Sequence, residues 1–597
     1  MMNFQAFYTG RMFDAYLHLG CHYTPDHTTF TVFAPGASRV CLTGDFNSWT
    51  ETEMNRIHNG QFWQLRIPDI PEGMFYKYRI YSGSGSYTDH CDPYGFGMEL
   101  RPGFASVVRD LNRYQFRDGV WMHLRSDCKN KPLNIYELHL GSWKRSDADP
   151  GFLNYREIAH ALVPYMKKYS YTHAELMPLA EHPIDNSWGY QCTGFFSPTS
   201  RFGTMDDLKY FVDYLHRSGI GVIMDFVPVH FASDSYALAN FDGSPLYEYP
   251  NNAVNFSEWG SPNFNHSRGE VQTFLQSCAY YWLKEYHFDG LRMDAISNII
   301  YWQGDQARGI NTNATDWLRG MNRSLKEAFP EIMLIAEDSS ACSGVTRPAA
   351  WGGLGFDYKW DMGWMNDTLN FFRTDPPYRS QEYHKLTFSM AYFFNENYLL
   401  PLSHDEVVHG KATIIQKMAG GYEQKFPQVR ALYVYMLTHP GKKLNFMGNE
   451  IAMFREWDEN REPDWDLLKY PLHDAFSHFM MRLNELYKKH PALYEQDYDQ
   501  AGFLWADCHQ ENRVLYAFER RSAGERILTV LNLSDQKADA FAVPVGNAKA
   551  LYLLLDSDDP RWGGSGIFDP ARSAAVNAGT ATVSSAAFSA QIYQIQN

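Results

Sequence analysis

Between residues 116 and 480 this chain alternates between short apolar stretches and segments with helical periodicity. In residues 204–219, for example, apolar side chains recur at intervals of three and four, and Thr204 and Asp207 are spaced as a helix-capping pair. Strands that alternate with helices predict a parallel sheet, and eight of them favour closure into a (β/α)8 TIM barrel. The eight strand candidates are residues 134–140, 173–179, 219–228, 288–296, 332–338, 354–361, 399–405 and 443–450.

Polar residues stand where several of these apolar stretches stop. In a (β/α)8 barrel the chemistry lies at the carboxyl ends of the strands. A carboxylate buried in an apolar strand is costly unless it is paired or used. We therefore predict an active site at the ends of four stretches. It comprises Asp225 near the end of the third stretch and His230 after it, Arg292 and Asp294 in the fourth, Glu337 and Asp338 in the fifth, and His404, Asp405 and Glu406 at the end of the seventh.

These residue types leave two kinds of chemistry open. One is a metal site made of carboxylates and imidazoles, although the chain has no H-E-x-x-H pair that would make it specific. The other is acetal chemistry, which needs one ionised and one protonated carboxylic acid. Side chains two apart on a strand share a face, so Arg292 would keep Asp294 ionised as a nucleophile. Either Glu337 or Asp338 would supply the acid, because neighbours on a strand face opposite ways.

The predicted barrel domain, residues 116–484, is flanked by two segments of a different character. Residues 1–115 contain short β-prone stretches between turn clusters, which predicts an N-terminal β-sandwich. In this segment Trp49 and Trp63 are either core residues or a platform for a sugar ring. Residues 485–597 are again apolar or alternating stretches, which predicts a C-terminal β-sandwich with no recognisable chemistry of its own.

The net charge and the cysteine pattern limit the kinds of partner and the cellular compartment that we expect for this protein. A formal net charge of −16 argues against nucleic-acid binding, which needs a basic face. The eight cysteines form no C-x-x-C pair, so they indicate neither a zinc site nor a disulfide framework. The first 20 residues lack a signal-peptide pattern, and no window reaches the ~18 apolar residues of a membrane span. We therefore expect a cytoplasmic protein with no membrane contact. We further expect a monomer with no metal and no cofactor.

Four blocks of this sequence resemble the α-amylase superfamily, glycoside hydrolase family 13. They are residues 225–230 (DFVPVH), 290–294 (GLRMD), 335–338 (IAED) and 402–405 (LSHD). The resemblance implies that Asp294 is the nucleophile, Glu337 the general acid/base and Asp405 a third carboxylate that stabilises the bound sugar. It thereby selects Glu337 over Asp338. It also implies glucose contacts in the cleavage subsite from Asp225, His230, Arg292 and His404, with Tyr190 stacked beneath the sugar.

Longer matches resemble one subfamily, the 1,4-α-glucan branching enzymes. The matching text includes residues 135–143 (IYELHLGSW), 188–191 (WGYQ), 197–203 (SPTSRFG), 344–348 (GVTRP), 402–411 (LSHDEVVHGK) and 446–450 (FMGNE). In the N-terminal segment, residues 44–49 (GDFNSW) and 92–94 (DPY) resemble a family 48 carbohydrate-binding module. One departure is Val229, which stands where the subfamily usually has glycine.

The resemblance implies a retaining transglycosylase whose partner is an α-glucan polysaccharide. Such an enzyme cuts an α-1,4 linkage and passes the chain to a glucan 6-hydroxyl, which makes an α-1,6 branch in a glycogen-like polymer. An α-glucan hydrolase of the amylase or debranching type would use the same catalytic residues with water as the acceptor. Only the sequence motifs shared with the branching-enzyme subfamily favour transfer of the glucan chain to a sugar hydroxyl. A third hypothesis is a non-catalytic glucan-binding scaffold, against which the presence of Asp294, Glu337 and Asp405 argues.

Overall fold

A computed structural model of the chain describes residues 2–146, 151–510, 514–566 and 574–596. The chain forms two compact units, the first from residues 1–127, 139–161 and 176–356 and the second from residues 128–138, 162–175 and 357–597. Eight strands close into a barrel in sequence order, which confirms the predicted (β/α)8 fold. They are β10 (Asn134–Leu138), β11 (His173–Leu176), β14 (Gly221–Phe226), β15 (Gly290–Met293), β16 (Met333–Ala336), β17 (Tyr358–Trp360), β18 (Tyr398–Leu402) and β19 (Lys442–Phe446).

The barrel strands pair in parallel within each unit. In the first unit β15 lies between β14 and β16, and in the second unit the order is β17, β18, β19 and β10. Every residue of β14, β15 and β16 is buried, which explains why these stretches are largely apolar and do not alternate between apolar and polar residues. The exceptions are Asp225 in β14 and Arg292 in β15. The strands end earlier than the predicted stretches do. Asp294 and Glu337 are therefore the first residues beyond β15 and β16.

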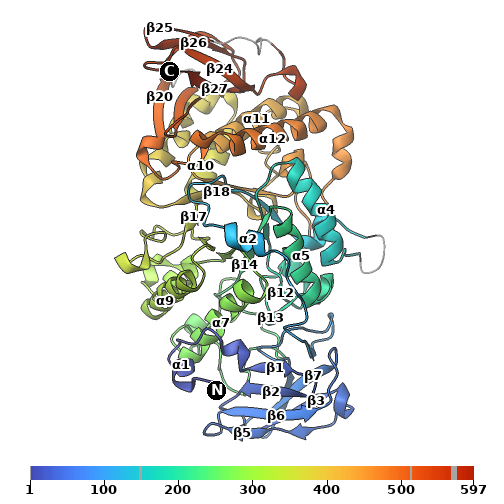
Figure 1. Cartoon of the computed structure of the whole chain (residues 1–597). Helices are drawn as coiled ribbons and strands as arrows, with labels where there is room; N and C mark the ends of the chain where they lie inside the picture. The colour runs from blue at the N-terminus through green and yellow to red at the C-terminus, as the bar shows by residue number, and fades with distance from the viewer. Residues whose placement is uncertain (1, 147–150, 511–513, 567–573, 597) are drawn as a thin grey trace. The chain divides into compact units, whose positions relative to one another are not determined.

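Helix α5 (Met205–Arg217) confirms the helix predicted over residues 204–219. Further long helices in the first half of the barrel are α4 (Tyr155–Lys168), α7 (Gly269–Glu285) and α9 (Thr312–Ala328). The second unit adds α10 (Met362–Arg373), α11 (Tyr422–Thr438) and α12 (Pro471–Lys489), of which α11 and α12 pack side by side (Figure 1). Helix α5 begins with the predicted capping pair, because Thr204 and Asp207 each accept a hydrogen bond from the backbone N–H of the other. Across the described ranges, no helix has the length and apolar character needed to cross a bilayer.

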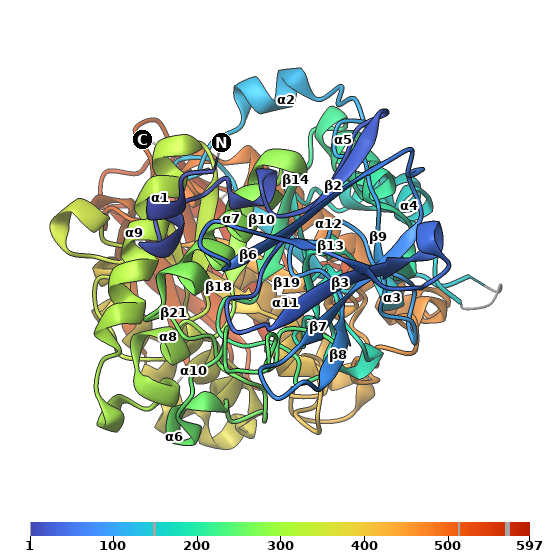
Figure 2. The same ribbon diagram turned by 90° about the horizontal axis from the view of Figure 1, so that it is seen from below.

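The N-terminal segment forms two antiparallel sheets, as predicted for a β-sandwich. One has the order β1 (Gly20–Tyr23), β2 (His27–Phe33), β6 (Phe62–Pro68), β5 (Asn55–Ile57), and the other β4 (Thr52–Glu53), β3 (Arg39–Gly44), β7 (Phe75–Tyr81), β8 (Tyr87–His90), with β9 (Ser106–Val107) also on β7. Figures 1 and 2 show these strands in blue, with β2 beside β6 and β3 beside β7. Trp63 is 2% exposed and belongs to the core, whereas Trp49 is 41% exposed.

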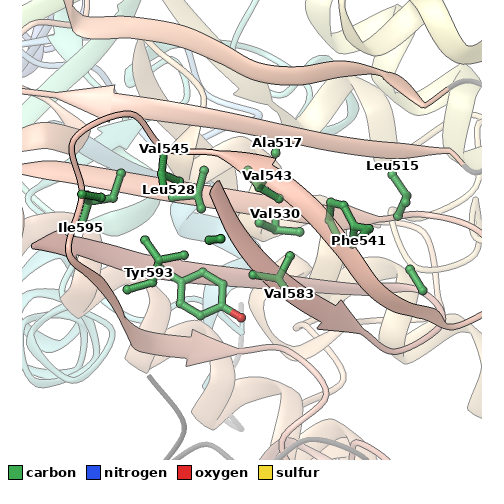
Figure 3. Packing of buried hydrophobic residues seen from close by; sticks show 14 residues of the cluster. Leu515, Ala517, Leu528, Val530, Phe541, Val543, Val545, Val583, Tyr593 and Ile595 are labelled. Atoms are coloured by element: carbon green, nitrogen blue, oxygen red, sulfur yellow. The ribbon is translucent and has the colours of Figure 1, made fainter. Parts of the chain in front are cut away.

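The C-terminal segment is an antiparallel sheet of eight strands, which confirms the predicted all-β domain. Its order is β20 (Phe503–Gln510), β21 (Leu515–Arg521), β22 (Arg526–Asn532), β27 (Ser589–Gln596), β24 (Ala550–Asp556), β25 (Ala574–Asn577), β26 (Thr580–Ser585), β23 (Ala538–Pro544). Leu528 and Val530 of β22 share one apolar cluster with Val543 of β23 and Val583 of β26 (Figure 3). Because strands from distant positions in the sheet share this cluster, the sheet folds over its own core.

Candidate active site at the strand ends

Arg292 of β15 is the residue around which the carboxylates of the first unit gather. Its Nη1 donates to both oxygens of Asp225, at 2.7 and 2.8 Å, and to Oδ1 of Asp294 at 2.8 Å. Its Nη2 lies 3.3 Å from Oε2 of Glu337. Burial lowers the pKa of Arg292, but the surrounding carboxylates, Asp225 foremost, raise that pKa well above its ordinary value. One buried, permanently charged guanidinium therefore contacts three carboxylates from three adjacent strands.

Backbone hydrogen bonds between neighbouring strands fix where Asp294 and Glu337 lie along the barrel axis. The N–H of Asp294 donates to the carbonyl of Phe226 at 3.0 Å, and the N–H of Glu337 donates to the carbonyl of Met293 at 3.1 Å. These bonds continue the parallel ladder one residue past the ends of the strands. The chain then turns at Ala295, which has a φ of 49° and donates its N–H to Oε2 of Glu337 at 2.7 Å. Strand register thus places both carboxylates at the mouth of the same sheet segment.

The carboxylates of this site differ in their solvent exposure. The side chain of Asp225 is 2% exposed, whereas those of Asp294 and Glu337 are 13% and 17% exposed. Asp338 is buried, and its Oδ1 accepts a hydrogen bond from the N–H of Ser340 at 2.9 Å. The adjacent acids therefore separate as strand alternation predicts, because Glu337 contacts Arg292 while Asp338 supports the next loop.

Tyr190 and His230 also belong to the first unit. The hydroxyl of Tyr190 donates to Oδ2 of Asp225 at 2.6 Å. Burial lowers the pKa of His230 to about 4, so its imidazole is neutral at pH 7. Its Nδ1 is buried and has no hydrogen-bond partner among the residues that the structure describes. A neutral ring nitrogen in this state suits a ligand hydroxyl, since a buried polar atom without a partner is costly.

His404 and Asp405 belong to the second unit, where they begin the short 3-10 helix η11 (His404–Val407) after β18. The backbone N–H and Nδ1 of His404 donate to the carboxylate of Glu137 at 2.9 and 2.6 Å. This carboxylate, 1% exposed in β10, sets the orientation and tautomer of the imidazole. Sequence reasoning missed Glu137. The signal was available, because Glu137 is an acid inside an apolar strand.

The arrangement in the first unit suits acetal chemistry. The partly exposed carboxylates of Asp294 and Glu337 both contact the buried guanidinium of Arg292. In such a pair one carboxylate can attack an anomeric carbon while the other transfers a proton. The alternative metal site has no comparable geometry. Over the ranges described, no three or more His, Cys, Asp and Glu side chains are grouped so that they could hold a metal ion.

Models of three protein families match parts of the chain. The model of carbohydrate-binding module 48 (isoamylase N-terminal domain) matches residues 18–95. The alpha amylase catalytic domain matches residues 158–246, and the alpha amylase C-terminal all-beta domain matches residues 505–596.

Full-length relatives and solved structures extend this likeness. The chain is 45% identical over 567 residues to the 1,4-alpha-glucan branching enzyme GlgB of Fusobacterium nucleatum, covering 94% of this chain and 92% of that protein. It is 43% identical over 571 residues to the enzyme of the same name from Bacillus subtilis, covering 94% and 91%. Its fold is similar to that of an Anoxybacillus pullulanase complexed with maltotetraose, with a TM-score of 0.75, 19% identity and coverage of 97% and 87%. A putative alpha amylase from Salmonella typhimurium gives a TM-score of 0.73, 19% identity and coverage of 97% and 99%.

Proposed function

We propose residue roles for this chain from the premise that it belongs to the family of 1,4-α-glucan branching enzymes. The reaction cuts an α-1,4 linkage in a glucan and attaches the released chain to a 6-hydroxyl, which creates an α-1,6 branch. The observation that carries the assignment is the contact of Arg292 with three carboxylates, two of which are partly exposed. The match to a carbohydrate-binding module supports an α-glucan polysaccharide as the partner.

In the first displacement, a carboxylate oxygen of Asp294 attacks the anomeric carbon from the β face. The bond between that carbon and the departing O4 breaks, and Glu337 gives its proton to O4. The product is a β-glycosyl-enzyme and a shortened glucan. Arg292 holds Asp294 in its ionised form for the attack, because a cation within hydrogen-bond distance favours the charged carboxylate.

In the second displacement, Glu337 takes the proton of a glucan 6-hydroxyl while its oxygen attacks the anomeric carbon. Asp294 departs as a carboxylate, and the two inversions together preserve the α configuration. This mechanism requires the two carboxyl groups to lie about 5–5.5 Å apart during the reaction. We assign stabilisation of the cationic sugar ring to Asp405, and contacts with the sugar in the cleavage subsite to Tyr190, Asp225, His230 and His404.

The test follows amylose by iodine colour, by reducing ends and by α-1,6 linkages. A branching enzyme removes the colour and creates α-1,6 linkages without a net gain of reducing ends. A hydrolase of the same fold would remove the colour and create reducing ends together, and a non-catalytic scaffold would change neither. Colour loss that is matched by new reducing ends, without new branches, would therefore overturn the proposed acceptor.

We also propose a cytoplasmic location and a monomeric state. All eight cysteines are described as free thiols, and six of them are buried, which fits a reducing compartment. For the oligomeric state, sedimentation equilibrium should give a mass near the 69.0 kDa of one chain. A mass of twice this value would show a dimer.

A further inference from the structure

Trp259 leaves a large aromatic surface in solvent directly beside His230. The residue is 51% exposed, although indole is among the side chains that gain most from burial. Its ring centroid lies 5.4 Å from that of His230, and the two ring planes are tilted by 35°. The histidine that we assign to the sugar therefore has an exposed aromatic ring as its neighbour.

The turn that carries Trp259 is held by its own hydrogen bonds. Ser257 donates its N–H to the carbonyl of Ser261 at 2.8 Å, and Gly260 donates its N–H to the carbonyl of Ser257 at 3.0 Å. Trp259 thus lies at the tip of a four-residue turn, next to Gly260 with a φ of 77°. Ser257 and Ser261 are buried, so the base of the turn is anchored. A ring on an anchored turn loses less conformational freedom when a ligand arrives.

The same turn is tied to the segment that carries Tyr190. The hydroxyl of Ser261 donates to Oε1 of Gln191 at 2.6 Å, and the preceding Tyr190 donates to Asp225 at 2.6 Å. His230 forms an isolated backbone bridge with Asn263, two residues after Ser261. The backbone positions of Trp259, Tyr190 and His230 are therefore linked through one hydrogen-bonded framework.

We propose that Trp259 binds the α-glucan chain by stacking on a glucose ring adjacent to the glucose that contacts His230. A glucose ring has apolar C–H faces, which pack on an aromatic ring, and an equatorial rim of hydroxyl groups, which need polar partners. The exposed indole offers the first surface, and the buried Nδ1 of His230 offers a polar partner. The inference rests on the proposed function for the identity of the ligand, and it adds a binding residue that lies outside the carboxylate cluster.

The experiment compares Trp259→Ala, Trp259→Phe and the wild-type enzyme in branching of amylose. Tyr552→Ala is the matched control, because Tyr552 has a similar exposure, 48%, in the C-terminal domain. We expect Trp259→Ala to raise KM for amylose by about tenfold, the equivalent of about 1.4 kcal/mol, with little change in kcat. Trp259→Phe should recover most of this loss because it restores an aromatic face, and Tyr552→Ala should keep the wild-type KM.

A second measurement does not depend on turnover. Calorimetric titration with maltoheptaose in an Asp294→Asn background should show about tenfold weaker binding when Trp259→Ala is added. Unchanged affinity and unchanged KM would overturn the inference, and so would an equal loss in Trp259→Phe, which would indicate a structural role of the indole. If the wild-type enzyme forms no α-1,6 linkages, the proposed function is wrong. If Trp259→Ala forms branches normally with the wild-type KM, the proposed function stands and only the role of Trp259 in glucan binding is rejected.

Discussion

A carboxylate oxygen of Asp294 lies 2.8 Å from Nη1 of Arg292, its neighbour two positions earlier in the chain. This pair is a local consequence of β15, because side chains two apart on a strand share a face. Asp225 and Glu337 reach the same guanidinium from the neighbouring strands β14 and β16. The four side chains therefore form one electrostatic unit, and a change to any of them alters the surroundings of the others.

Asp294→Ala and Glu337→Ala should both lose activity on amylose, Asp294→Ala to below about a thousandth of the wild-type rate. Rescue by azide distinguishes the two roles. The substrate is an α-maltosyl fluoride, because fluoride departs without the help of an acid, and the anomeric configuration of the glycosyl azide product is the readout. In Asp294→Ala, azide replaces the nucleophile and attacks from the β face, which gives a β-glycosyl azide. In Glu337→Ala, azide attacks the glycosyl-enzyme and gives an α-glycosyl azide. Nuclear magnetic resonance distinguishes the two anomers, and exchanged outcomes would mean that the roles are reversed.

Arg292→Met should destabilise the fold as well as inactivate the enzyme. Removing one partner of a buried ion pair leaves uncompensated charge and costs about 3–5 kcal/mol, and here three carboxylates lose the same partner. Urea unfolding followed by circular dichroism measures the free energy of unfolding. Arg323→Met is the control, because Arg323 is 63% exposed and lies 4.0 Å from Glu327 on the surface of α9. The control should change stability by less than about 1 kcal/mol, and equal effects of the two substitutions would contradict the buried role of Arg292.

Glu137→Gln should lower activity through His404. The amide cannot accept from both the backbone N–H and Nδ1 of His404 as the carboxylate does, so the imidazole is held less firmly. Misplacement of a group in a site by about 1 Å can reduce a rate about 10²-fold, and we expect a loss of that order in kcat/KM. The pH profile of kcat/KM should shift as well, because the substitution removes a carboxylate in contact with an imidazole. A lower melting temperature with an unchanged pH profile would indicate only a structural role for Glu137.

The pH dependence of stability should report a buried cluster away from the candidate active site. His216 lies 2.8 Å from Asp118 and 2.9 Å from Asp289. Burial lowers the pKa of His216, but the two carboxylates outweigh burial and raise its pKa from 6.5 to about 9. The stabilisation by protonated His216 is therefore complete below pH 6.5. It is lost as the pH rises towards 9, because the unfolded state releases its proton first.

We expect this group to contribute a fall of about 3 kcal/mol in the free energy of unfolding across that interval. Urea unfolding between pH 6 and 9.5 measures the fall, and His216→Gln provides the reference, because glutamine does not titrate. The difference between the wild-type protein and His216→Gln should shrink as the pH rises. Parallel curves for the two proteins would show that the imidazole is not protonated in the fold.

Much of the site could be predicted from the sequence because strand alternation and barrel topology are simple rules. Arg292 and Asp294 share a face by spacing alone, and the polar residues that close the apolar stretches mark the strand ends. Glu137 could have been singled out as an acid inside an apolar strand, but its partner could not, because His404 is distant in sequence and no local pattern relates the two. Trp259 escaped prediction because a single tryptophan in a loop carries no periodic signal.

The sequence by itself determined the order of strands and helices, the barrel and its all-β flanks, and the residue types at the strand ends. These properties follow from apolar periodicity and turn residues, which act over a few positions of the chain. Only the tertiary structure decided that one guanidinium contacts Asp225, Asp294 and Glu337, and that Trp259 lies beside His230. It also showed which of the two adjacent acids has which partner, because Glu337 contacts Arg292 whereas Asp338 accepts a hydrogen bond from Ser340. Those facts depend on the register of neighbouring strands and the course of long loops, where side chains far apart in sequence compete for the same space and the same partners.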